Sequence, residues 1–327
     1  MSKSVTIWLA EVLVLSLLSS SVFSQACSCG GAPLTNALEL PTSAAGVWQF
    51  GFTYQYNSIS DVVSGSDQLT DDTRRRSVHA GLMEISYGLS GRLTVSGLFT
   101  LLQQERTSQA GHGAGEFLRT RGIGDGLLLL KYNLIPYSVQ SQRQVAVGAG
   151  VKIPFGESSL RSNNILIAAD MQPGSGAWDA VLWGYLSQGL YRHLPIGVTA
   201  SATYRFTGTN NRFGTSSEGY NFGDELVATL SGTYRSFGKT DITAGFRYRS
   251  VTADRFADQE LPNSGGRWLN LAPGLSYEIS KAVSAGVAGE LPLYRKLDGT
   301  QLTTDYRLSV ALFFNLGDKQ ASQPWSL

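Results

Sequence analysis

The sequence predicts an all-β protein, a transmembrane antiparallel up-and-down β-barrel of about twelve strands with both termini in the periplasm. Three observations predict this fold. An export signal begins the chain, segments of alternating apolar and polar residues continue to its end, and the connections between them alternate between short and long. Short periplasmic turns and longer external loops are typical of barrels in the bacterial outer membrane, where we expect this chain to reside.

The composition agrees with a single closed sheet that spans a membrane. Charged residues make up 16% of the 327 residues, well below the roughly 25% of average soluble domains. The net charge is +1, from 26 Lys and Arg against 25 Asp and Glu, so no basic surface for nucleic acid is expected. The expected partners are outer-membrane lipid and a small-molecule solute, and nothing in the sequence indicates an oligomeric state.

Residues 1–26 have the features of a signal peptide. Lys3 supplies the positive start, residues 12–18 form an apolar core, and residues 24–26 form a small-x-small cleavage site. A membrane anchor would need about 20 continuous apolar residues, and Glu11 together with the serines at 19–21 leaves too few. We therefore expect the mature chain to begin at residue 27.

Residues 27–45 are expected in the periplasm, either free or folded into the lumen as a plug. Both cysteines of the chain, Cys27 and Cys29, lie here. Three interpretations remain: lipidation of Cys27, a metal or redox site at the pair, or an inert tail. Two thiolates supply at most half of a tetrahedral metal site, and no histidine or carboxylate lies close by. The inert tail is favoured, and no cofactor is expected.

The barrel is predicted over residues 46–316, followed by a tail at 317–327. Its first strand places an aromatic residue at every second position from Trp48 to Tyr56. Because successive side chains on a strand point to opposite faces, these rings are expected to face lipid, and the residues between them to line the lumen. The candidate strands are 46–56, 76–87, 92–103, 123–134, 144–154, 177–187, 196–207, 222–235, 241–251, 267–278, 282–293 and 302–316.

Two of the candidate strands alternate less regularly than the others. In 76–87 the apolar positions switch parity near Met83, and in 177–187 Asp179 shares its parity with Val181 and Trp183. A β-bulge, or a plugged lumen, would explain either irregularity.

Charged residues fall on the lumen face of the predicted strands. They are Asp125, Lys131, Lys152, Arg205, Glu225, Arg247, Arg249, Glu290, Asp305 and Arg307. Opposite charges on neighbouring strands would form ion pairs that stiffen the wall. Alternatively, the charges form a constriction that selects solutes, and the excess of arginine would then favour anions. An apolar solute would need an apolar path, for which the inward candidates are Leu98, Leu127, Leu129, Val181, Trp183 and Phe313.

The sequence does not indicate an enzyme. An outer-membrane lipase, the remote alternative, would need a serine and a histidine within hydrogen-bond reach. The histidines are His79, His112 and His193. We expect His112 in an external loop, His193 in a periplasmic turn and His79 at the rim of the barrel, with no serine constellation beside it.

Five glycine-rich segments resemble the signature stretches of a known family. They are residues 122–132, 148–156, 172–179, 273–277 and 291–302. In this order they resemble the outer-membrane transporter family named for the meta-cleavage (MetA) pathway of phenol degradation, which is related to long-chain fatty-acid and toluene channel proteins. The resemblance implies passive uptake of small apolar or aromatic compounds, without catalytic residues. A barrel with a side-chain-filled lumen that serves a structural or surface-interaction role is the alternative, because Trp183, Tyr185 and Arg249 are bulky inward residues.

Overall fold

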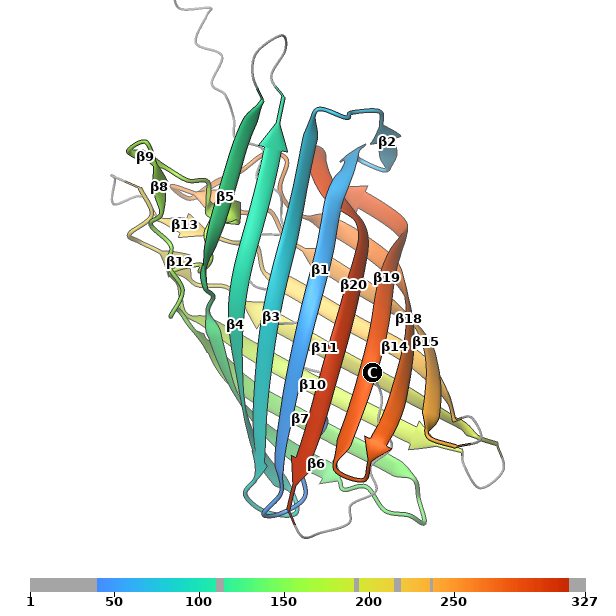
Figure 1. The fold of residues 1–327 in the computed structure, drawn as a ribbon. Helices are drawn as coiled ribbons and strands as arrows, with labels where there is room; N and C mark the ends of the chain where they lie inside the picture. The colour runs from blue at the N-terminus through green and yellow to red at the C-terminus, as the bar shows by residue number, and fades with distance from the viewer. Residues whose placement is uncertain (1–39, 110–114, 191–193, 215–218, 236–237, 318–327) are drawn as a thin grey trace, which may run out of the picture.

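The computed structural model describes residues 40–109, 115–190, 194–214, 219–235 and 238–317. Within these ranges twelve antiparallel strands form a closed barrel (Figure 1). The wall strands are β1 (Trp48–Ser64), β3 (Arg74–Gly88), β4 (Leu93–Ser108), β5 (Glu116–Ile123) continued by β6 (Gly126–Ile135), β7 (Arg143–Ile153), β10 (Asp179–Gly189), β11 (Ile196–Phe206), β14 (Glu225–Arg235), β15 (Thr240–Val251), β18 (Gly266–Ser280), β19 (Val283–Leu297) and β20 (Thr300–Leu316). In the same ranges, no helix has the length and apolar character to cross a membrane.

The barrel closes through β1, which forms backbone pairs with the last strand and with β3. Trp48 lies opposite Leu316 of β20 on one side and opposite Tyr87 of β3 on the other. Each of the twelve predicted strands corresponds to one wall strand, so the predicted fold class is confirmed. The wall strands β1, β3 and β4 are longer than predicted and project beyond the membrane band.

The connections alternate in length, as the sequence predicts. At one end of the barrel β3, β6, β10, β14 and β18 end and the next wall strand begins shortly after each of them, and β1 begins and β20 ends there too (Figure 1). The long connections 65–73, 154–178 and 252–265 lie at the opposite end, as does the long connection between β11 and β14. The connection between β4 and β5 and the two-residue turn 298–299, at the same end, are no longer than the short connections. The short-turn end is the periplasmic end by the rule for such barrels.

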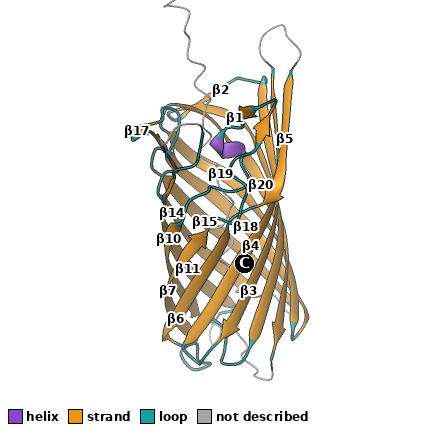
Figure 2. Cartoon of the chain, turned by 90° about the vertical axis from the view of Figure 1, so that its left-hand side faces the viewer, coloured by secondary structure: helices purple, strands orange, loops and turns teal. Residues whose placement is uncertain are grey.

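The long connections carry small elements of their own. These are β2 (Asp67–Leu69), β8 (Arg161–Ser162), β9 (Ile165–Leu166), the 3-10 helix η2 (Ala169–Met171), β12 (Thr209–Asn210), β13 (Tyr220–Asn221), β16 (Arg255–Phe256) and β17 (Gln259–Glu260). Figure 2 shows η2 between the strands at the long-loop end. The strands β12, β13, β16 and β17 form a separate four-stranded sheet, which we call the cap sheet.

The outer face of the barrel carries the aromatic ladder of β1. The Trp48 and Tyr54 side chains are about half exposed (45% and 51%), whereas Gln49 between them is 4% exposed because it faces the lumen. At the short-turn end Trp48 packs on Tyr87, with ring centroids 4.5 Å apart. At the other end Tyr56 packs on Tyr306 at 6.0 Å. The segment of β1 from one belt to the other, 48–56, contains nine residues, which matches the length of a strand that crosses a membrane, about 9–11 residues.

The two irregular strands are continuous and contain no bulge. β3 keeps one register against β1 and β4, and β10 keeps one register against β7 and β11. In β3 the even-numbered Ala80, Leu82 and Glu84 are all buried in the lumen. A bulge in these strands is therefore the wrong explanation, and apolar side chains inside the lumen account for both patterns.

One wall strand is interrupted at Gly124 and Asp125, between β5 and β6. Both halves pair with β4, but only β6 also pairs with β7. The sequence predicted a loop over 104–122 here, and this boundary is wrong because β4 and β5 extend the hairpin outward. A Cβ on Gly124 would lie 2.1 Å from Oγ1 of Thr100, and that hydroxyl donates to the carbonyl of Asp125 at 3.2 Å.

We expect Gly124→Ala to destabilise the barrel by about 1–3 kcal/mol, because the added methyl displaces Thr100 and breaks its hydrogen bond. Urea unfolding of the refolded protein in lipid vesicles measures this change. The matched control is Gly184→Ala on β10, where an added Cβ meets nothing within 4 Å. Equal stabilities for the two variants would contradict the conclusion that the interruption at Gly124 requires glycine because Thr100 lies against it.

Candidate functional site in the barrel lumen

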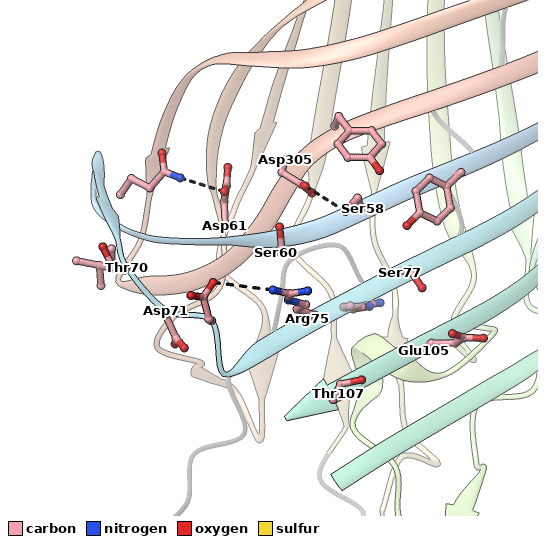
Figure 3. Close-up of a pocket in the computed structure, with 16 residues that line it drawn as sticks. Ser58, Ser60, Asp61, Thr70, Asp71, Arg75, Ser77, Glu105, Thr107 and Asp305 are labelled. Carbon is pink, nitrogen blue, oxygen red and sulfur yellow. Dashed lines mark hydrogen bonds and ion pairs between the residues drawn. The ribbon is translucent and has the colours of Figure 1, made fainter. Parts of the chain in front are cut away.

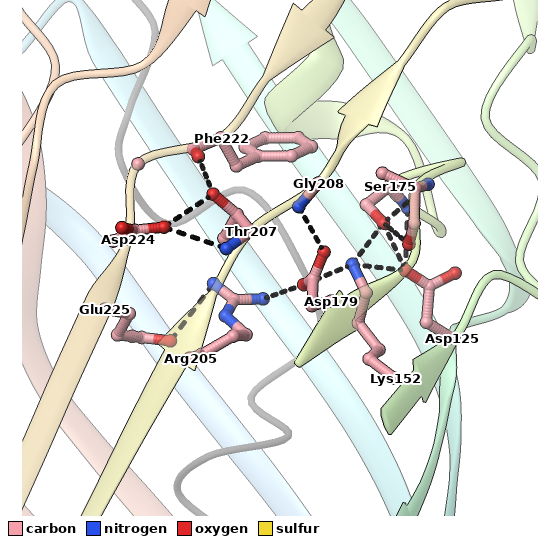
Figure 4. A network of polar contacts seen from close by, with 12 residues as sticks. Asp125, Lys152, Ser175, Asp179, Arg205, Thr207, Gly208, Phe222, Asp224 and Glu225 are labelled. Atoms are coloured by element: carbon pink, nitrogen blue, oxygen red, sulfur yellow. Dashed lines mark hydrogen bonds and ion pairs between the residues drawn. The ribbon is translucent and has the colours of Figure 1, made fainter. Parts of the chain in front are cut away.

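A ladder of alternating charges crosses six neighbouring positions of the wall on the lumen face. In strand order it contains Asp125, Lys152, Asp179, Arg205, Glu225 and Arg249. Figure 4 shows its first five members, from Asp125 to Glu225. The nitrogen–oxygen distances between successive members are 3.2, 2.7, 3.6, 3.1 and 2.6 Å. Each charge is therefore balanced by a carboxylate or a cation on the next strand.

The ladder is fixed at both ends by further contacts. At one end the hydroxyl of Ser175 donates to Asp125 at 2.6 Å and also contacts Lys152. At the other end the guanidinium of Arg249 lies 4.8 Å from the ring centre of Trp268. The indole nitrogen of Trp268 donates to Thr303 on β20 at 2.9 Å. Polar contacts thus continue from the break at Asp125 round to the last strand.

Burial explains why the members of the ladder alternate in sign. The side chains of Lys152 and Asp179 are 2% and 1% exposed. A buried charge without a partner costs several kcal/mol, so charges in such a position are retained only as hydrogen-bonded pairs. The ladder makes this part of the wall nearly neutral despite its many ionised groups.

A second charged group lies next to the ladder, on β15, β18, β19 and β20, around Glu290 of β19. Its carboxylate accepts from Arg247 at 2.9 Å, from Arg307 at 3.0 Å and from Asn270 at 3.3 Å. The three charged side chains are 12–15% exposed, more than Lys152 and Asp179 of the ladder. This group is more open to solvent than the ladder, of which only Arg249, 17% exposed, is comparable.

Asp305 does not join the group around Glu290, although the sequence predicted that it would face the lumen beside Arg307. Its carboxylate accepts from Ser58 at 3.1 Å. The register between β1 and β20 shifts on both sides of Ile59, and Asp305 has no partner across the strands there. This irregularity turns the Asp305 side chain to the outer face, so its prediction as a lumen residue is wrong.

Lys131 lies below the ladder, fully buried, and contacts the N-terminal segment. Its ammonium donates to the carbonyl of Leu40 at 2.6 Å and to Glu84 at 3.2 Å. It also lies 4.9 Å from the ring centre of Trp183. The lysine therefore joins the wall, the aromatic side chains of the lumen and the chain that precedes β1.

Residues 40–45 pass through the periplasmic end of the lumen. Thr42 donates to Asn133 at 2.8 Å, and the backbone N–H of Ser43 donates to Thr94 at 2.9 Å. Both residues are almost fully buried. Gly88 permits the passage, because a Cβ there would lie 2.0 Å from the carbonyl oxygen of Ala44. The rest of the predicted segment, 27–39 with Cys27 and Cys29, lies outside the described residues, as do 1–26 and 318–327.

An apolar stripe, one continuous cluster of buried side chains, covers the lumen face of five neighbouring strands, β3, β4, β6, β7 and β10. It consists of Ala80, Leu82, Leu98, Leu102, Leu127, Leu129, Ala146, Val181, Trp183 and Tyr185. The rings of Trp183 and Tyr185 stack at 5.6 Å. Five of the six predicted apolar path residues belong to this stripe. The sixth, Phe313, packs instead on Leu40.

The long connection 154–178 folds inward over the upper end of the stripe. Asp170 of η2 is buried and accepts from Arg76 of β3 at 2.9 Å. The hydroxyl of Thr120 donates to the carbonyl of Met171 at 2.7 Å. Pro173 packs on Gly122 of β5, where a Cβ would meet the proline ring at 3.0 Å. This inward loop was not predicted from the sequence, which indicated only a long external loop at 155–176.

The cap sheet packs on η2 from outside. Tyr220, Phe222 and Ala169 form its buried apolar cluster. The hydroxyl of Tyr220 donates to Asp254 at 2.6 Å, and the N–H of Gly223 donates to the other oxygen of Asp254 at 2.8 Å. Burial and, to a smaller extent, the negative charge of Asp170 raise the pKa of Asp254.

The remaining candidates give no catalytic or metal site in the part of the chain that the structure describes. His79 shares a 2.7 Å hydrogen bond with the hydroxyl of Tyr54 on the outer face, at the upper aromatic belt. No group of three His, Cys, Asp or Glu residues among the described positions could hold a metal ion. His112 and His193 lie outside the described residues.

Comparisons with known proteins bear on the fold. No model of a protein family matches the chain, and no curated protein matches it. Among solved structures the chain is similar to the COG4313 outer membrane channel from Pseudomonas putida F1, with a TM-score of 0.67 and 16% identity, over 85% of this chain and 97% of that one. The Ralstonia pickettii toluene transporter TbuX gives a TM-score of 0.42 and 12% identity, over 90% and 100% of the two chains. The fold is that of bacterial outer-membrane barrels, in agreement with the predicted class and location.

We expect Asp179→Asn to lower the free energy of unfolding by about 3 kcal/mol, because it leaves Lys152 and Arg205 with one carboxylate each inside the wall. Urea unfolding in vesicles measures the change. Arg255→Gln removes the exposed ion pair with Glu260 and is the control, with an expected loss below about 1 kcal/mol. An Asp179 variant as stable as the control would rule out the ladder as a stabilising element.

We also expect the cap sheet to loosen as the pH rises. Because the pKa of Asp254 is raised in the folded state, its contribution is complete below the ordinary value of about 4 and is lost as the pH rises through the raised pKa. Hydrogen-exchange protection factors of residues 219–223 should fall over this range. Asp254→Asn should remove the dependence, whereas Asp72→Asn, at a side chain 91% exposed, should leave it unchanged.

Proposed function

We propose that the chain is a passive channel of the bacterial outer membrane for small aromatic or apolar compounds. The apolar stripe carries this proposal. A barrel that conducts water and ions has a polar lumen face, whereas five neighbouring strands of this barrel present leucine, valine, tryptophan and tyrosine to the interior. The sequence resemblance to the phenol-degradation transporter family supports the same solute class, and the similar Pseudomonas putida structure is described as a channel.

In this proposal the charged residues predicted from sequence, other than Asp305, form the narrow part of the lumen. The ladder supplies a nearly neutral wall beside the stripe, which suits a solute without charge. The group around Glu290 has two arginines for one carboxylate and more solvent access. It would hold the polar end of a solute, such as a hydroxyl or a carboxylate group. Residues 40–45 would narrow the periplasmic exit as a plug.

A second candidate is a barrel with a structural or surface-interaction role. One observation favours it: every member of the apolar stripe is less than one-tenth exposed, so the side chains fill the space beside them. The cap sheet would then be the functional surface. The two candidates differ in a single measurable property, the passage of solutes.

Uptake of a radiolabelled small aromatic hydrocarbon tests the proposal, in cells whose own channels for such compounds are deleted. We expect the wild-type chain to support uptake and Trp183→Ala to increase it several-fold, because removal of the indole widens the lumen beside the stripe. Phe246→Ala is the control, since this ring faces lipid on β15 and is 50% exposed.

The absence of uptake with both the wild-type chain and Trp183→Ala, in folded barrels, would reject the channel and favour the structural candidate. Equal effects of Trp183→Ala and Phe246→Ala would reject the stripe as the path. Passage of sugars and ions through the wild-type barrel in reconstituted vesicles, without uptake of the hydrocarbon, would reject the apolar solute class.

A further inference from the structure

A polar cavity of about 710 Å³ lies on the outer face of the barrel at the long-loop end (Figure 3). Strands β1, β3, β4 and β20 form its wall, and the connection 65–73 forms its roof. This volume is within the range of sites for small molecules, about 300–1,000 Å³. The side chains that line it include Tyr56, Ser58, Ser60, Thr70, Asp72, Arg75, Ser77, Glu105, Thr107, Asp305 and Tyr306.

The register of the strands places this cavity outside the lumen. Ser58 lies opposite Ser77, and the neighbouring pair Asn57 and Val78 has the inward parity of Ala80 and Leu82. Ser58 and Ser77 therefore point outward. Below them Tyr56 lies against Tyr306 in the upper aromatic belt. The cavity thus opens just above the belt, where lipid headgroups of the outer leaflet lie.

The roof of the cavity is held in place by its own contacts. β2 pairs with the end of β1, and Gln68 donates to Asp61 at 3.0 Å. Asp71 accepts from the backbone and hydroxyl of Thr73 at 2.8 and 2.5 Å and from Arg74. These hydrogen bonds lower the pKa of Asp71 to about 2. The roof needs no ligand to keep this shape at neutral pH.

The carboxylates around the cavity are largely neutralised by arginines outside its wall. Asp61 pairs with Arg295 at 2.7 Å, and Glu105 pairs with Arg119 at 3.0 Å. Asp71 pairs with Arg74, and Arg76 pairs with Asp170 of η2. The remaining groups are hydroxyls, the carboxylate of Asp305, the exposed ion pair of Arg75 with Asp72 and the two tyrosine rings. This surface binds neither an apolar chain nor a bare ion well, but it matches a ring that has hydroxyl groups at its edge and C–H groups on its face.

We propose that this cavity binds the saccharide headgroup of a glycolipid in the outer leaflet of the membrane. Tyr56 and Tyr306 pack against the face of a sugar ring, while Ser77, Thr107 and Asp305 bind its hydroxyls. Arg75, 70% exposed at the open side, lies 4.0 Å from the exposed carboxylate of Asp72. It can exchange this ion pair for one with a phosphate or another acidic substituent on the sugar. This site is separate from the lumen and does not depend on the passage of a solute.

Binding of fluorescently labelled rough-type lipopolysaccharide to the refolded protein in detergent micelles tests the proposal. Ser77→Trp fills the cavity and should weaken binding roughly tenfold or more. Thr107→Val keeps the volume and removes one hydroxyl, and it should weaken binding about fivefold. Ser250→Trp is the matched control, because Ser250 lies between Leu226 and Arg267 on the outer face of β15, away from the cavity.

The source of the sugar is decided by competition with free core oligosaccharide. Displacement only by intact glycolipid supports the headgroup, whereas equal displacement by the free oligosaccharide supports a site for soluble saccharide. The proposal is overturned if Ser77→Trp and Thr107→Val both bind as the wild type does, or if Ser250→Trp weakens binding as much as Ser77→Trp. Folding of each variant is checked by its heat-dependent migration in gel electrophoresis. This measurement distinguishes a variant that has lost the binding site from one that has not folded.

Discussion

Closure of the sheet by β1 is the constraint on which the rest of this structure depends. Within hydrocarbon an unpaired backbone N–H or C=O costs several kcal/mol, so a spanning sheet cannot leave an edge. β1 pairs with β20 on one side and with β3 on the other over its membrane-spanning length, so the backbone groups on both of its edges have partners. Once the sheet is closed, each strand has one face toward lipid and one toward the lumen, and the period of two in the sequence follows from this geometry.

The closed wall imposes a second condition on the interior. Ionised groups that point inward are removed from most of the solvent, and they are retained because a partner of opposite sign lies on the next strand. The ladder from Asp125 to Arg249 satisfies this condition strand by strand. Apolar side chains that point inward need no such partner and are buried by packing on one another, as in the stripe around Trp183. The lumen is thus divided into a charged part and an apolar part.

Much of the architecture could be predicted from the sequence because the period of two acts on every strand. The aromatic ladder at Trp48 and the inward position of Arg205 follow directly from parity. Features that break parity or lie between strands could not be predicted. Asp305 lies beside a register shift that turns its side chain to the outer face. In β3 the polar Glu84 lies on the same inward face as the apolar Ala80 and Leu82, and in the sequence this mixture looked like a switch of the apolar positions from one face to the other.

Residues of the long connections were also beyond sequence reasoning. Asp170 is a main contact of the lumen, yet it lies in a segment without periodicity, and only the inward fold of residues 154–178 brings it to Arg76. Asp179 had the correct parity, but its role depends on the simultaneous presence of Lys152 and Arg205 on either side. Such a role depends on residues of three strands, so the sequence pattern of a single strand does not indicate it.

The uneven lumen contains two sets of positions that will accumulate different substitutions. At the positions of the apolar stripe an inward residue is constrained by volume, so exchange among aliphatic side chains of similar size is tolerated and a new charge is not. In the ladder and around Glu290 the inward residues are constrained by the balance of charge, so a change at Glu290 is tolerated only with a change at Arg247 or Arg307. Related chains should therefore vary in side-chain shape within the stripe and in paired charge reversals at the charged positions.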